Sequence, residues 1–185
     1  MGGSTGSTRA FAFPASTVNL LLMNDQTPTL LIQRPQLTDV VESMRKFAYK
    51  GKTDLVIRKL VEDICADLEQ GDYASECLAC YYWVCQNIRY MRDIYNVEFV
   101  KEPRQIMATK SGDCDDMATL LASMLLTSGN SCSFVLACFD GSGIPSHVYV
   151  EVDTPTGPVP LDPVANRITA DMAKRVTSRS IVRVG

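Results

Sequence analysis

The stretch from residue 111 to residue 126 constrains the fold more than any other part of this 185-residue chain. Its apolar residues recur with the period of an α-helix that buries a single stripe, at Met117, Leu120, Leu121, Met124 and Leu125. Asp113 is a good N-cap residue, and Asp115 and Asp116 place negative charge in the first turn. The pattern therefore predicts a buried helix that begins beside Cys114.

A cysteine at the start of a buried helix is a candidate nucleophile. The free N–H groups of the first turn and the positive end of the helix dipole both favour a thiolate at Cys114. The carboxylates of Asp113, Asp115 and Asp116 oppose this effect, because negative charge raises the pKa of a thiol. We expect an imidazole partner to outweigh them. The alternative is a buried core cysteine, a placement that the three aspartates make unfavourable.

The single histidine of the chain opens a predicted strand. Residues 147–153 alternate strictly between apolar and polar side chains, which is typical of a half-buried strand. Val148, Val150 and Val152 share one face, and His147 lies on the other. His147 is therefore a candidate general base, and the alternative is an ordinary strand histidine that hydrogen-bonds or faces solvent.

Asp162 is the third candidate, in a short predicted strand that ends at a proline. The turn expected at residues 154–158 makes this strand antiparallel to the one that begins at His147, which can place the two side chains together. The alternative is a turn aspartate of the kind that is common before proline. In chain order, Cys114, His147 and Asp162 offer a nucleophile, a general base and an orienting carboxylate.

Three sequence blocks resemble those of the transglutaminase-like branch of the papain-fold cysteine enzymes. They are Gly-Asp-Cys-Asp-Asp at 112–116, His-Val-Tyr-Val-Glu-Val at 147–152 and Pro-Leu-Asp-Pro at 160–163. Residues 83–93 resemble the helix that precedes the cysteine block in the same proteins. The resemblance covers roughly residues 37–163. The compact version with Gly-Asp-Cys-Asp-Asp is similar to transglutaminase-like proteins encoded near bacteriophage structural genes.

The resemblance implies an α+β fold, in which a helical N-terminal part packs on a central cysteine-bearing helix and an antiparallel β-sheet. It also implies that Cys114, His147 and Asp162 form a catalytic triad. The order of the predicted elements favours the same fold class. Helices are expected at 37–48, from a cap at Thr53 to Gly71, from Asp72 to Ile88, at 103–107 and at 170–175, and further strands at 97–100, 132–139 and 181–184.

Two units are predicted along the chain. Residues 1–36 are expected to form a flexible polar arm and an apolar hairpin with strands at 18–23 and 29–32, and residues 37–185 the transglutaminase-like catalytic domain. The arm and the hairpin would suit docking to a protein partner. The resemblance suggests phage structural proteins for that role.

Composition excludes several classes of partner and site. A net charge of −3 leaves no electrostatic footprint for nucleic acid or an anionic membrane, and no apolar run is long enough to span a bilayer. The seven cysteines are odd in number and lie mostly in apolar patterns, which favours free thiols in a reducing cytosol. Together with the resemblance, this predicts the bacterial host cytosol or incorporation in a virion.

No metal or cofactor is predicted. Cys77 and Cys80 have the spacing of a zinc pair, but no second pair and no second histidine complete four ligands. Asp113, Asp115 and Asp116 lack the glycine turn and the distal glutamate of an EF-hand loop.

The residues predict a thiol-dependent acyl-transfer enzyme acting on a protein or peptide substrate. Hydrolysis would make it a cysteine peptidase or amidase, and transfer to an amine would make it a transglutaminase; the resemblance favours hydrolysis. The first oxyanion donor is the Cys114 N–H, and Trp83, Gln86 and Tyr90 are open candidates for the second. The alternative is a phage virion or assembly protein that uses the same fold for protein contacts.

Overall fold

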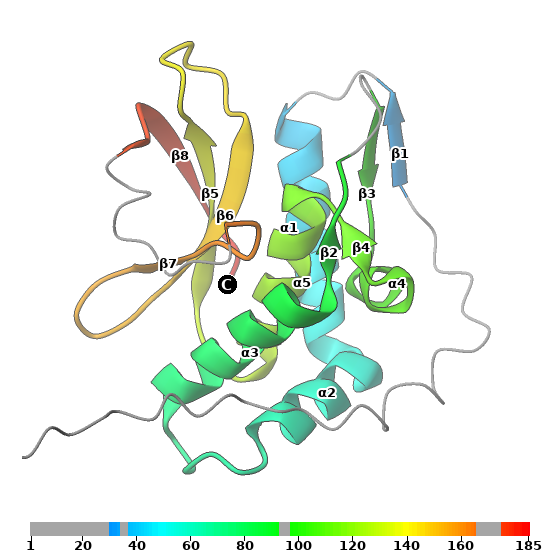
Figure 1. Ribbon diagram of the computed structural model, residues 1–185, viewed down its shortest axis with the longest axis vertical. Coiled ribbons are helices and arrows are strands. Elements are labelled where there is room, and N and C mark those ends of the chain that lie inside the picture. Colours follow the sequence, from blue (N-terminus) through cyan, green and yellow to red (C-terminus); the bar gives the residue numbers. More distant parts are fainter. Residues whose placement is uncertain (1–29, 34–36, 93–96, 166–174) are drawn as a thin grey trace, which may run out of the picture.

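The computed structural model describes residues 30–33, 37–92, 97–165 and 175–185. Within them the chain folds as an α+β protein, as predicted. The helices are α1 (Leu37–Thr53), α2 (Leu55–Cys65), α3 (Tyr73–Asn87), α4 (Pro103–Thr109) and α5 (Cys114–Thr127). The strands are β1 (Leu30–Gln33), β2 (Arg89–Tyr90), β3 (Val97–Val100), β4 (Ser111–Gly112), β5 (Cys132–Cys138), β6 (His147–Val152), β7 (Val159–Leu161) and β8 (Ser178–Arg183). Helix α5 lies between a four-stranded antiparallel sheet and the other helices (Figure 1).

The central helix α5 is buried on all sides. Every residue from Asp115 to Leu126 is buried, and the helix contacts the other four helices as well as β5 and β6. The prediction of a single buried stripe is therefore wrong, because the remaining face carries small residues that let neighbouring helices approach: Ala118, Ala122 and Ser123. The predicted start of the helix is confirmed, since the Asp113 side chain accepts the Asp116 N–H at 3.3 Å.

The four-stranded sheet has the order β7-β6-β5-β8, and each neighbouring pair is antiparallel. The predicted antiparallel pairing of β6 with β7 is confirmed, with Val150 opposite Leu161. Strand β6 is buried on both faces, so the prediction of a half-buried strand is wrong. Its valines join the main core, while Tyr149 packs in a small second cluster with Val135 and Ala137 on the other face.

Helix α1 continues to Thr53, beyond its predicted end at residue 48. Gly51 is helical and buried, and a Cβ added there would lie 2.5 Å from Ser123 Oγ and 2.9 Å from Pro103 Cγ. Tertiary packing explains this glycine, since only a residue without a side chain lets α1 approach α4 and α5 so closely.

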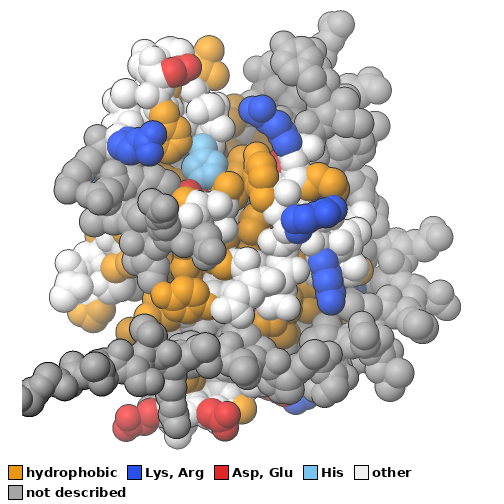
Figure 2. All heavy atoms as spheres, in the orientation of Figure 1, with side chains coloured by type: hydrophobic (Ala, Val, Ile, Leu, Met, Phe, Trp, Pro, Cys, Tyr) orange, Lys and Arg blue, Asp and Glu red, His pale blue; other side chains and the backbone are white. Residues whose placement is uncertain are grey.

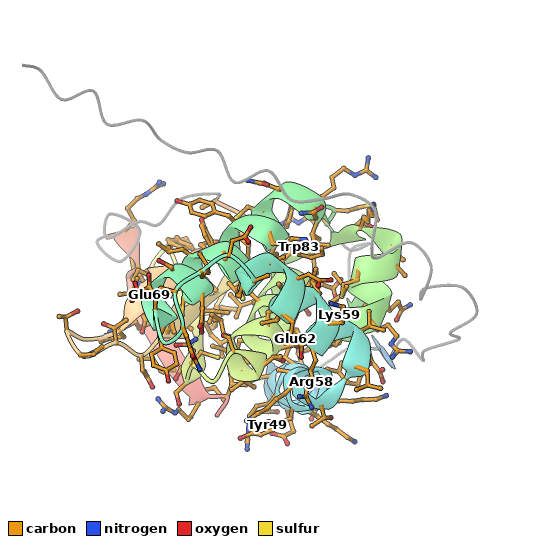
Figure 3. All side chains as sticks on the ribbon, turned by 90° about the horizontal axis from the view of Figure 1, so that it is seen from below. Tyr49, Arg58, Lys59, Glu62, Glu69 and Trp83 are labelled. Atoms are coloured by element: carbon orange, nitrogen blue, oxygen red, sulfur yellow. The ribbon has the colours of Figure 1, made fainter. Side chains whose placement is uncertain are left out.

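Helix α2 shows a local signal that was misread. Its N-cap is Asp54 and not Thr53, because the Asp54 carboxylate accepts the Val56 N–H at 2.8 Å. The outer face of α2 is polar, and Figure 3 shows its exposed side chains from below: Arg58, Lys59 and Glu62. No helix in the described part of the chain is both long enough and apolar enough to cross a bilayer.

Two small sheets join segments that are distant in sequence. Strand β1 is antiparallel to β3, and β2 is parallel to β4 with Tyr90 opposite Gly112. Residues 29–32 were predicted as one arm of a hairpin; the other arm, at 18–23, lies outside the described residues, as does the helix predicted at 170–175 except for its last residue. The division between residues 36 and 37 stays a prediction.

Replacing Gly51 with alanine tests the close packing of α1 on α5. Alanine raises intrinsic helix propensity by about 1 kcal/mol, yet the clash with Ser123 and Pro103 should cost more, so we expect a net loss of about 1–2 kcal/mol in the free energy of unfolding. Chemical denaturation measures it, with Lys52→Ala on the exposed part of the same turn as the control. A stabilised Gly51→Ala variant would show that α1 does not approach α5 this closely.

Candidate active site

Cys114 is the first residue of α5 and is half-buried. The chain enters the helix from β4, which ends at Gly112, and extended Asp113 then forms the N-cap. A Cβ on Gly112 would lie 2.5 Å from the Asp116 Cβ, so glycine is required for the strand to pass this close to the first helical turn. The thiol is therefore held at a helix start whose approach is fixed by packing.

The structure brings His147 and Asp162 together. His147 opens β6 and Asp162 follows β7, and the antiparallel register of these strands places the imidazole Nε2 2.8 Å from the carboxylate Oδ2 of Asp162. Because a carboxylate only accepts hydrogen bonds, Nε2 carries the proton in this pair. The lone pair of a neutral His147 is then on Nδ1, which is the nitrogen that can take a proton from a thiol.

The Asp162 carboxylate is fixed by its surroundings. The side chain is 2% exposed, and its Oδ1 accepts the N–H groups of Val164 at 3.0 Å and Ala165 at 3.3 Å. The backbone carbonyl of Asp162 accepts the hydroxyl of buried Tyr81 on α3 at 3.1 Å. These bonds leave Oδ2 for the imidazole, so the orientation of His147 is set from a rigid position.

Cys114 lies next to the residue that follows His147. Helix α5 packs on β6, and the backbone N–H of Val148 faces the Cys114 sulfur, where it lowers the pKa of the thiol. The His147 ring lies 6.1 Å from the ring of Phe139 and 6.4 Å from that of Tyr149, between ring centroids. The histidine side chain is 17% exposed, and Figure 2 shows it at the surface, bordered by hydrophobic side chains.

The charge state of the resting thiol differs from the expectation. Burial, followed by the charges of Asp113 and Asp115, raises the pKa of Cys114 to about 12, although the N–H groups of Val148 and of Cys114 itself lower it. These surroundings favour the neutral thiol, in contrast to the thiolate expected at the start of the helix.

The comparisons with known proteins give the family. The model of the transglutaminase-like superfamily matches residues 58–163, which is more than half of the chain and includes all three candidate site residues. The chain belongs to the transglutaminase-like superfamily. No curated protein matches the sequence.

Solved structures show the same papain-like, transglutaminase-like fold at low sequence identity. A candidate protease of Parabacteroides distasonis has a TM-score of 0.55 at 12% identity over 78% of this chain and 29% of its own. A candidate cysteine protease of Cytophaga hutchinsonii has a TM-score of 0.50 at 14% identity over 84% of this chain and 52% of its own. Calcium-bound LapG of Legionella pneumophila has a TM-score of 0.51 at 17% identity over 77% of this chain and 87% of its own. This chain therefore spans about a third of the length of the Parabacteroides protein and about half of the length of the Cytophaga protein.

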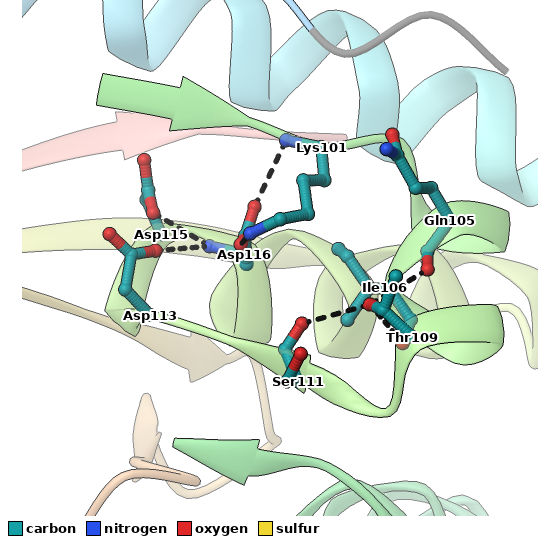
Figure 4. A network of polar contacts seen from close by, with 8 residues as sticks. All are labelled: Lys101, Gln105, Ile106, Thr109, Ser111, Asp113, Asp115 and Asp116. Atoms are coloured by element: carbon teal, nitrogen blue, oxygen red, sulfur yellow. Dashed lines mark hydrogen bonds and ion pairs between the residues drawn. The ribbon is translucent and has the colours of Figure 1, made fainter. Parts of the chain in front are cut away.

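The aspartates around the nucleophile of this transglutaminase-like protein form an internal network. Carboxylate oxygens of Asp113, Asp115 and Asp116 lie within 4.8 Å of one another. Among the described residues, these three aspartates form the cluster that could hold a cation. The Asp116 N–H donates to Asp113 and to Asp115, while its carboxylate accepts the N–H of Lys101 at 3.0 Å and pairs with the Lys101 ammonium (Figure 4).

Burial raises the pKa of Asp116 to about 6, although Lys101 opposes the shift. The lysine thus supplies the positive charge that a cation would otherwise bring to this carboxylate. The arrangement fits a structural role, in which the end of β3 is tied to the first turn of α5.

The structure separates the three candidates for a second oxyanion donor. Trp83 is buried in the core on α3, and Gln86 is exposed near the end of that helix. Tyr90 lies in β2 opposite Gly112, two residues before the nucleophile. Burial raises the pKa of the Tyr90 phenol, and Cys114 is the next largest cause. Of the three, Tyr90 lies directly opposite the strand that leads to the nucleophile.

Alkylation of Cys114 by iodoacetamide tests the charge state of the thiol. With a pKa of about 12, the thiolate fraction grows tenfold per pH unit, so the labelling rate should rise with a slope near one between about pH 7 and pH 10. Mass spectrometry of the peptide that contains Cys114 measures the labelling rate. Glutathione in the same buffers is the control, because the labelling rate of a thiol with an ordinary pKa levels off within this pH range. A rate that levels off near neutral pH would instead indicate a thiolate–imidazolium pair.

Proposed function

We propose that this protein is a cysteine peptidase or amidase that cleaves amide bonds of a protein or peptide substrate. Cys114 is the nucleophile, His147 the general base and Asp162 the residue that orients the imidazole. The observation that carries the proposal is the bond from His147 Nε2 to a buried, fully engaged carboxylate, at the start of the strand on which the helix of Cys114 packs. A histidine that only supported the fold would not need its tautomer fixed in this way.

The neutral thiol determines how the first step proceeds. His147 Nδ1 removes the proton from Cys114 as the sulfur bonds to the substrate carbonyl carbon, so the thiolate does not form in advance. The imidazolium, stabilised by Asp162, then gives this proton to the leaving amine as the C–N bond breaks. Water attacks the resulting thioester, His147 takes its proton, and the released sulfur is protonated again.

The negative charge on the substrate oxygen requires two donors. The backbone N–H of Cys114 is the first, because it belongs to the first turn of α5 and has no partner within the helix. We assign the second to the Tyr90 phenol. Burial, Cys114, Asp113 and Asp115 all raise the pKa of Tyr90, and this keeps the hydroxyl protonated and able to donate.

Hydrolysis is favoured over amine transfer by the structural relatives, two of which are described as candidate proteases. The described cysteines are all free thiols, which supports a reducing compartment such as the cytosol. The alternative, a virion or assembly protein, depends on residues 1–29, which lie outside the described residues. It becomes the better account if the chain proves to have no Cys114-dependent chemistry.

Peptide cleavage by matched variants tests the proposed triad. Cys114→Ala and His147→Ala should lose at least about 10³-fold in kcat/KM, and Asp162→Asn about 10²–10⁴-fold, while Cys65→Ser on remote α2 should keep full activity. A peptide library read by mass spectrometry detects hydrolysis, and incorporation of a fluorescent primary amine detects transfer. Equal activity of the wild type and Cys114→Ala, or no activity in either, would reject the enzyme and favour the assembly role.

Replacing Tyr90 with phenylalanine tests the second oxyanion donor. Loss of the hydroxyl should lower kcat about 10- to 100-fold and leave KM nearly unchanged, because the bond strengthens only in the transition state. Tyr73→Phe, at an exposed position that begins α3, is the matched control and should have no effect. A Tyr90→Phe variant with wild-type kcat would remove Tyr90 from the mechanism.

A further inference from the structure

Three exposed basic residues surround the strand that carries Tyr90. Arg89 lies in β2, Arg92 follows two residues after Tyr90, and Lys110 precedes β4. The Arg89 N–H donates to the Lys110 carbonyl at 2.9 Å, so the two segments lie side by side. We refer to Arg89, Arg92 and Lys110 as the basic strip. Figure 2 shows Lys and Arg side chains over β2, separated from the histidine by hydrophobic side chains.

The basic strip has no carboxylate partner among the residues that the structure describes. Most arginines and lysines near α4, α5 and the sheet pair with a carboxylate, including Lys50 with Glu102, Arg104 with Asp54 and Arg179 with Glu151. Within the described part of the chain, no ion pair forms on Arg89, Arg92 or Lys110. Three positive charges without a described carboxylate partner therefore lie on two neighbouring segments of a protein whose net charge is −3. Such a local field attracts an anionic group from solution.

The basic strip lies beside the proposed nucleophile. The parallel pairing of β2 with β4 puts Tyr90 next to Gly112, two residues before Cys114. Arg92 is close enough to the Tyr90 phenol to lower its pKa, against the carboxylates of the site. Neighbouring strands are about 4.8 Å apart, and a substrate residue in extended form spans about 3.4 Å. A side chain within about two residues of the scissile bond can therefore reach the strip.

We propose, building on the peptidase function above, that the basic strip selects peptides that carry an aspartate or glutamate within about two residues of the scissile bond. The acidic side chain pairs with Arg92 and is supported by Arg89 and Lys110.

A pair of fluorogenic peptides tests this inference. One peptide carries glutamate and the other glutamine, two residues from the cleaved bond on the side that the library identifies. At low salt we expect about five- to tenfold higher kcat/KM for the glutamate peptide than for the glutamine peptide. The difference should come from a lower KM, and it should shrink at about 0.5 M salt because salt screens the charges. Arg92→Glu should abolish or reverse the preference. Lys46→Glu, an exposed position on α1 with the same change in net charge, should preserve it.

Binding of the two peptides to Cys114→Ala, followed by fluorescence anisotropy, tests recognition apart from chemistry. Tighter binding of the glutamate peptide that is lost in the Arg92→Glu, Cys114→Ala double variant supports the basic strip even if cleavage is absent, in which case the peptidase proposal alone fails. Equal affinities for both peptides, or equal effects of Arg92→Glu and Lys46→Glu, would overturn the inference and leave the peptidase function standing if cleavage persists.

Discussion

The burial of α5 on every side is the constraint on which the site depends. A helix enclosed by four other helices and a sheet cannot shift along its axis without breaking contacts in the core, so its first residue has a fixed position. Glycines at the two tightest approaches, Gly51 and Gly112, let the backbone of neighbouring segments come within contact of α5. Cys114 thereby occupies a fixed place beside β6, with its side chain partly buried against the core.

Burial has an electrostatic consequence for this site. It removes water from Cys114 and leaves the carboxylates of Asp113 and Asp115 near the thiol, so the neutral form is favoured more strongly than the helix start can offset. The proposed chemistry then relies on the imidazole to accept the proton during attack. The carboxylate of Asp162, held by Val164, Ala165 and Tyr81, fixes the tautomer that this requires. Lys101 pairs with Asp116 and offsets the negative charge of this carboxylate in the first turn.

Local signals in the sequence predicted the parts of the site that depend on nearby residues. The cap at Asp113 predicted where α5 begins. The alternation of β6, the turn at 154–158 and the proline-ended strand β7 predicted that Asp162 can lie beside His147, and the resemblance implied the same pair. What depends on distant segments could not be read in this way. The helical role of Gly51, the parallel pairing of β2 with β4, the link between Tyr90 and Cys114, and the raised pKa of the thiol all arise from tertiary contacts that leave no periodic pattern.

Direct observation of a thioester on Cys114 is the most decisive measurement. The wild-type protein is mixed with an activated peptide ester, quenched in acid within milliseconds to seconds, digested and read by tandem mass spectrometry. The account predicts a mass gain equal to the acyl group on the peptide that contains Cys114, and faster decay of this species in the wild type than in His147→Ala. Product formation without the adduct, or an adduct on another of the seven cysteines, would contradict it.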